Sequence, residues 1–138
     1  MAVRLTGFIR SALAAASGVT NLCAATNIYA NEIPEGSGLP RVVITEPRGD
    51  NDHLFGGKEL GRGTIVVTVY AEDGGLAWDI GKACHAVLNP LTGTFDSNQN
   101  LLALVRVSDT IKIQSQRPKS GKPVTQIPIS YLAFVEET

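Results

Sequence analysis

"TIVVTVYAEDGGLAWDIGKACHAVL", residues 64–88, holds one strand and one helix separated by a short break. Residues 64–70 are almost all β-branched, and such side chains favour an extended strand. Gly74 and Gly75 then interrupt the strand, and Asp73 before them is a suitable helix N-cap. The apolar residues that follow share one helical face, and they are Leu76, Ile80, Ala83, Cys84, Val87 and Leu88. The stretch therefore predicts a strand over 63–72 and an amphipathic helix over 76–88.

A second helix is predicted near the N-terminus. Its apolar stripe at helical period consists of Leu5, Phe8, Ile9, Ala12, Leu13 and Ala16. Gly18 follows as a natural residue to end the helix. Residues 1–31 contain no acidic residue, which is also typical of a transit peptide. The apolar stripe nevertheless favours a first core helix of the mature fold. Arg10 breaks the apolar run, which excludes a secretory signal, and no apolar run reaches the roughly 18 residues of a membrane span.

The stretch between the N-terminal helix and the strand over 63–72 is rich in Pro and Gly. Pro34 and Pro40 fix φ, and Gly36 permits positive φ, so residues 28–40 form an extended approach to a strand over 41–46. A long loop over 47–61 then joins that strand to the next one. We expect the two strands to form a hairpin.

Two further strands are expected after the helix over 76–88, which Asn89 and Pro90 end. They cover residues 101–110 and 126–135, and a polar loop lies between them. The order α-β-β-α-β-β predicts an α+β fold with one four-stranded, mostly antiparallel sheet and two helices on one face. The length of 138 residues predicts a single domain, 1–138.

The composition describes an ordinary globular chain. It is 43% hydrophobic and 18% charged with a net charge of −1, so no global field draws it to nucleic acid or to a membrane surface. Its two cysteines, Cys23 and Cys84, form neither a disulfide framework nor a zinc motif. We interpret them as small buried apolar residues.

The sequence contains no recognisable catalytic constellation. Gly121 and Lys122 precede Pro123, which a phosphate-binding loop does not allow, and the glycine-rich run over 56–63 enters a strand instead of a helix. Cys84 and His85 are adjacent on a helix, where their side chains diverge, so they cannot act as nucleophile and base. Asp79 and Lys82 are expected to be a surface pair. We predict a protein that is not an enzyme, without cofactor, metal or catalytic residues.

Two loops carry more charge than an ordinary hairpin tip needs. The first, over 47–61 with the start of the next strand, contains Arg48, Asp50, Asp52, Lys58 and Arg62. The second, over 111–124, contains no acid and carries Lys112, Arg117, Lys119 and Lys122. Solvated loop tips are the simpler interpretation. The alternative is that an oligomer uses these loops to reach its neighbours.

The order of elements resembles the tail-completion or tail-terminator proteins of long-tailed bacteriophages, over nearly the whole chain. In that family an N-terminal helix leads through an Ile-Tyr, Pro, Gly, Pro approach into an apolar strand. Here the approach begins at Ile28 and Tyr29 and ends at Pro40, and Val42, Val43 and Ile44 follow it. The strand over 65–71, the helix over 76–88 and a final long hairpin complete the resemblance.

The resemblance implies a structural virion protein at the head-proximal end of the tail, assembled in the host cytoplasm. Its partners would be further copies of itself in a hexameric ring, the tail tube protein and the neck or head-completion protein. DNA would pass through the lumen without sequence recognition, and no catalytic residue is implied. The first loop would then serve a ring or docking interface, and the second a cationic contact. A small α+β binding or assembly-chaperone module and a small enzyme with an unrecognised site remain as alternatives.

Overall fold

The computed structural model describes residues 5–31, 38–46, 60–96, 99–106, 114–116 and 124–137. The helices in these segments are α1 (Leu5–Ala15), α2 (Ser17–Thr20), the 3-10 turn η1 (Ala25–Asn27) and α3 (Gly74–Leu88). The strands are β1 (Ile28–Ala30), β2 (Arg41–Thr45), β3 (Leu60–Ala71), β4 (Gly93–Asp96), β5 (Gln99–Arg106), β6 (Gln114–Gln116) and β7 (Val124–Glu137). Together they form an α+β fold.

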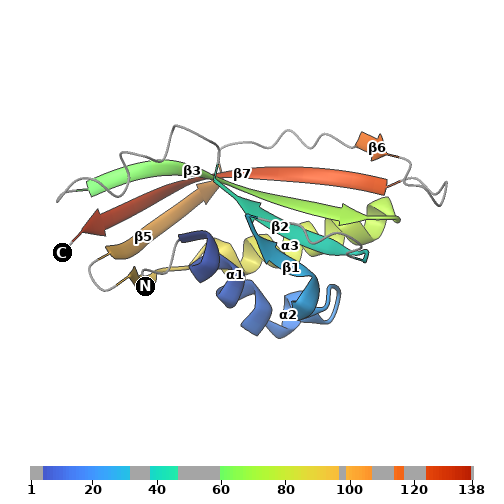
Figure 1. Cartoon of the computed structure of the whole chain (residues 1–138), viewed down its shortest axis with the longest axis horizontal. Coiled ribbons are helices and arrows are strands. Elements are labelled where there is room, and N and C mark those ends of the chain that lie inside the picture. Colours follow the sequence, from blue (N-terminus) through green and yellow to red (C-terminus); the bar gives the residue numbers. More distant parts are fainter. Residues whose placement is uncertain are drawn as a thin grey trace.

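One sheet organises the molecule (Figure 1). Its strand order is β1-β2-β3-β7-β5-β4, and β6 pairs with β7 off this path. The long antiparallel ladder of β3 and β7 lies at its centre and runs from the pair Leu60–Glu136 to the pair Ala71–Thr125. β1 is parallel to β2, and the other pairs are antiparallel. All three α-helices lie on one face of the sheet.

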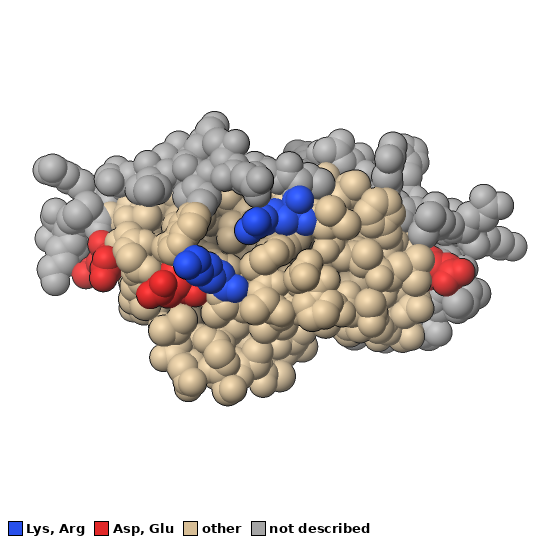
Figure 2. Space-filling model, turned by 180° about the vertical axis from the view of Figure 1, so that it is seen from behind, with Lys and Arg blue, Asp and Glu red and all other residues tan. Residues whose placement is uncertain are grey.

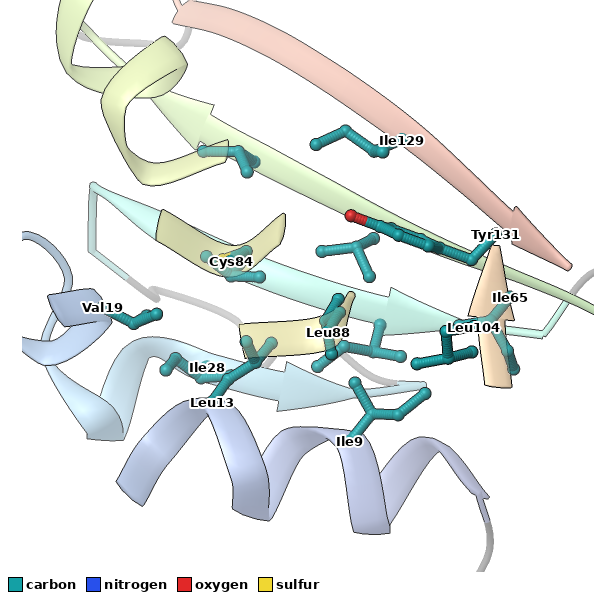
Figure 3. Close-up of a cluster of buried hydrophobic side chains, with 14 of the residues drawn as sticks. Ile9, Leu13, Val19, Ile28, Ile65, Cys84, Leu88, Leu104, Ile129 and Tyr131 are labelled. Carbon is teal, nitrogen blue, oxygen red and sulfur yellow. The ribbon is translucent and has the colours of Figure 1, made fainter. Parts of the chain in front are cut away.

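The core lies between this face and the helices (Figure 3). Alternate residues of β3 and β7 point to the helices, because successive side chains of a strand leave on opposite sides. From β3 they are Ile65, Val67, Val69 and Ala71, all fully buried. Leu5, Ile9 and Leu13 of α1, with Ile80, Cys84 and Leu88 of α3, are equally inaccessible. The apolar stripes that predict the two helices are therefore the faces that pack on the sheet.

Local polar contacts fix the start of the chain on the sheet. Arg10 donates from Nε to the carbonyl oxygen of Ile28 at 3.0 Å and from Nη2 to that of Ala25 at 3.3 Å. Asn31 has a positive φ of 69°, which asparagine tolerates better than most residues. Its side-chain amide donates to Thr6 Oγ1 at 2.9 Å. These contacts join α1 to both ends of β1.

The predicted helices correspond to α1 and α3, and the predicted strands to β2, β3, β5 and β7, of which β2 and β3 form the expected antiparallel pair. The expectation of only four strands and two helices is wrong. β1, β4, β6 and α2 are three or four residues long, too short to show a hydrophobic period. Gly18 lies inside α2 and is not the glycine that ends a helix. Of the predicted strand over 101–110, residues 107–110 lie outside the described residues.

Candidate assembly interface

The residues singled out in the two charged loops lie almost entirely outside the described residues. These are Arg48, Asp50, Asp52 and Lys58 of the first loop, and Lys112, Arg117, Lys119 and Lys122 of the second. Only the backbone of Arg62 is described, in β3, where it pairs with Phe134 of β7.

Each of the two loops leaves the sheet near the middle of the β3–β7 ladder, after Thr45 and after Arg106, and rejoins it at an end of the ladder. The first loop rejoins the sheet at Leu60, at one end of the β3–β7 ladder. Residues 117–123 of the second connect Gln116 to Val124, at the other end of the ladder. A twelve-residue strand spans ~40 Å at about 3.3 Å per residue. The fold therefore places the points where the two loops rejoin the sheet at opposite ends of this ladder.

The buried thiols are poor nucleophiles. Burial raises the pKa of Cys23 to about 11. Burial, with a smaller contribution from Cys23, raises the pKa of Cys84 to about 12. Both side chains remain protonated near neutral pH, whereas nucleophilic attack requires the thiolate. Their environment is that of packing residues.

His85 is bonded to a residue that sequence inspection does not connect with it. Its Nδ1 lies 2.9 Å from the hydroxyl of Tyr131, and the two rings stack with centroids 5.8 Å apart. Tyr131 is completely buried, and desolvation, followed by the effect of Cys84, raises its pKa to about 12, while Arg106 acts in the opposite direction. A buried tyrosine hydroxyl needs a partner. The pair therefore joins α3 to β7 and supports the fold.

The described segments also show no sign of a metal site or of a membrane span. They contain no group of three His, Cys, Asp or Glu residues placed to hold a metal ion. In the same segments, no helix combines the length and the apolar character needed to cross a bilayer.

The side of the sheet away from the helices carries an apolar surface that we call the β5–β7 patch. It consists of Leu102, Val105, Leu132 and Phe134. Leu102 and Val105 are 39% and 46% exposed, whereas Leu132 and Phe134 are half-buried. Val105 pairs with Leu132, and a bulge at Leu102 lets the next residue pair with Phe134. Exposed Glu136 follows on the same face of β7.

A second exposed apolar side chain lies on α3. Trp78 is 42% exposed, and the ammonium of Lys82 lies 5.9 Å from the centroid of its ring. One helical turn separates the two residues, and Asp79 is exposed beside them. We call these three residues the Trp78 ridge. Among the described residues on the face shown in Figure 2, charged side chains are few and uncharged residues predominate.

The short outer strands are poorly suited to pair with another chain. β1 is three residues long, and Arg10 already occupies the carbonyl of Ile28. β4 is four residues long, has an irregular register between Thr94 and Asp96, and begins at Gly93 with φ of 145°. Short, irregular strands of this kind protect sheet edges from strand addition. The two outer strands of the main path thus favour contacts through faces over contacts through edges.

The described segments thus combine buried cysteines that stay protonated with exposed apolar side chains on two faces of the subunit. A model of the family described as "Tail completion protein gp17" matches residues 8–119, which is most of the chain. The chain therefore belongs to this family and is a structural protein of a phage-type tail, which confirms the resemblance noted from the sequence.

The fold has a solved counterpart. It is similar to a chain in a structure described as "Virion of native gene transfer agent (GTA) particle", with a TM-score of 0.68 and 16% identity. The match covers 93% of this chain and 91% of that one. No curated protein sequence matches.

Proposed function

We propose that the protein is a tail terminator: it forms a ring that caps the finished tail tube and joins the tail to the head-neck complex. The observation that carries this proposal is the family match over residues 8–119. The fold likeness to a chain of a gene transfer agent virion, over nearly the full length of both chains, supports a place in such a particle. The position is the head-proximal end of the tail, reached after assembly in the host cytoplasm.

The role is structural and does not involve catalysis. The family match describes a tail component, and the raised pKa values of Cys23, Cys84 and Tyr131 keep these groups neutral near pH 7. His85 is engaged by the hydroxyl of Tyr131. The buried ionisable groups of the described core thus serve packing and need no cofactor.

The ring is a homohexamer with the tail tube on one side and the neck protein on the other. The two loops rejoin the sheet at opposite ends of the β3–β7 ladder, which suits a subunit that contacts different partners at its two ends. We assign the first loop, with Arg48, Asp50, Asp52, Lys58 and Arg62, to the ring or docking interface. Deletion of residues 50–58 should leave a folded protein that no longer completes tails.

The second loop makes a cationic contact with an acidic partner ring or with the DNA in the lumen, without reading its sequence. Phosphate contacts by Lys and Arg need no base recognition, and they weaken with salt. Simultaneous change of Lys112, Arg117, Lys119 and Lys122 to Ser should impair tail joining or DNA retention while folding is unchanged. If the variant still assembles rings, joins tails and retains DNA, the loop is only solvated surface and the cationic contact is refuted.

The proposed function is tested by depletion of the protein during particle assembly. We expect filled heads and separate tails in electron micrographs, because the joint between them is missing. Addition of the purified protein to the depleted extract should restore infectious particles. Normal joined particles in its absence would exclude the terminator role.

A further inference from the structure

We propose that the Trp78 ridge of one copy packs on the β5–β7 patch of the next copy, and that this contact closes the ring. The inference rests on the proposed function, because it takes the ring as given and names the surfaces that hold it together. The occupant of each surface is therefore a second copy of this chain.

The exposed large apolar side chains of the described segments fall on these two surfaces. They are Trp78, with 42% of its surface exposed, Leu102, with 39%, and Val105, with 46%. Tryptophan is enriched among the interface residues that contribute most of the binding energy. Such residues usually fill a well-packed pocket on the partner. The half-buried side chains of Leu132 and Phe134, next to Val105 and the bulge, provide an apolar floor for such a contact.

The two surfaces lie on opposite sides of the sheet. α3 packs on the helix-covered face with Ile80, Cys84 and Leu88, so its exposed ridge points away from the sheet. The β5–β7 patch lies on the other face of the same sheet. When two different surfaces of one molecule meet, each copy leaves one surface of each kind free for the next copy. Repetition of this head-to-tail contact generates a ring when the rotation closes.

The charges beside the two surfaces are complementary. Exposed Lys82 and Asp79 belong to the Trp78 ridge, and exposed Glu136 flanks the β5–β7 patch on the same face of β7. A second copy can therefore place the positive Lys82 of its ridge near the negative Glu136 of this patch. Charges at the rim of an apolar contact set its register and exclude wrong partners.

The contact of Lys82 with Trp78 prepares the ridge for binding. A cation over an indole face restricts the ring, so less conformational freedom is lost when a partner covers it. Strand addition is the main alternative route to a ring. It is disfavoured at β1, where Arg10 holds the carbonyl of Ile28, and at β4, where the register is irregular.

A charge-reversal series tests the register of this contact. Lys82→Glu and Glu136→Lys should each weaken self-association about tenfold or more, because each brings like charges together. The two changes combined in one chain should restore association toward the original value. Thr26→Glu, which adds an acid at an exposed site on η1, is the matched control and should form rings normally. Sedimentation and native mass spectrometry give the assembly state. If both single variants associate weakly and the double variant does not regain association, Lys82 and Glu136 do not face each other across the contact.

A mixing experiment tests the head-to-tail geometry. Trp78→Ala damages one surface and Val105→Glu damages the other, so each variant alone should be monomeric. In an equimolar mixture, the intact ridge of the Val105→Glu variant can bind the intact patch of the Trp78→Ala variant. The two surfaces left free in this pair are both damaged, so assembly should stop at a heterodimer. Circular dichroism must show that both variants are folded. Rings from either variant alone, or no dimer in the mixture of folded variants, would contradict the proposal.

The outcome is separable from that of the proposed function. Variants that assemble rings like the original chain and complete tails would refute this interface while the terminator role stands. Joined particles after depletion of the protein would refute the terminator role itself. An unmodified chain that remains monomeric both in solution and on isolated tails would overturn the interface.

Discussion

The two faces of the β3–β7 ladder carry different kinds of side chain although they belong to the same strands. On the helix-covered face, Ile65, Val67 and Val69 have no exposed surface. On the other face, Val66 and Tyr70 of the same strand are only half-buried, and Val105 of β5 is 46% exposed. An apolar residue therefore stabilises the subunit on one face and remains available for contact on the other. Substitutions can separate these roles.

The largest effect is expected for Ile80→Ala, in the centre of the helix-covered face. Ile80 is completely buried in α3, so truncation removes apolar contacts and leaves a cavity. The free energy of unfolding of the monomer should fall by about 2–5 kcal/mol. Urea denaturation measures it. An unchanged unfolding curve would show that α3 does not pack as described.

Alkaline pH should destabilise the same face. Folding raises the pKa of Cys84 from 9.0 to about 12 and that of Tyr131 from 10.0 to about 12, so the unfolded chain loses these protons first. The resulting stability is complete below pH 9 and is lost as the pH rises toward 12. Between the unfolded and folded pKa values, the free energy of unfolding should decrease by about 1.4 kcal/mol per pH unit for each group. Cys84→Ala should give a shallower slope than the original chain, and equal slopes would contradict the assignment.

A smaller effect is expected for Arg10→Met, on α1 beside the outer strand β1. The change keeps much of the aliphatic stem and removes the donors to the carbonyls of Ile28 and Ala25. Hydrogen bonds from a charged group contribute about 1.5–3 kcal/mol. Amide exchange should become faster in β1 before it changes in β3 and β7. If the amides of β1 exchange equally slowly in the variant and in the original chain, Arg10 does not hold β1 in place.

The smallest effect on the subunit is expected for Val105→Ser, on the outer face. Val105 is exposed, so the monomer should change in stability by no more than about 0.5 kcal/mol. Ring formation should nevertheless weaken, because the same side chain belongs to the proposed contact. A loss of monomer stability as large as that of Ile80→Ala would remove the distinction between the two faces.

The sequence predicts the helices and the long strands because their signals are local. The β-branched run over 64–70 and the stripe from Leu76 to Leu88 are visible without tertiary information, and both lie in elements that the structure contains. β1 and β4 escaped prediction because they become strands only by pairing with β2 and β5. Their residues alone are too few to show a period.

The candidate surfaces could not be predicted for a different reason. Leu102 and Val105 have the apolar character of core residues, and their exposure follows from the bulge in β5 and from the covering of only one sheet face by helices. His85 and Tyr131 are 46 positions apart, so their hydrogen bond depends on how α3 lies on β7. The loop residues chosen by charge lie outside the described segments, apart from the backbone of Arg62.

The central ladder also has a consequence for how the chain folds. β3 ends at Ala71 and its partner β7 begins at Val124, so residues 72–123 must be synthesised before the two can meet. Closing so long a connection reduces chain entropy before any ladder bond forms, and topologies of this kind fold more slowly than local ones. Until then one edge of β3 lacks its permanent neighbour. Newly made subunits therefore pass through a period in which the unpaired, β-branched edge of β3 favours aggregation. Rapid pairing of that edge with β7 limits the number of subunits lost to aggregation.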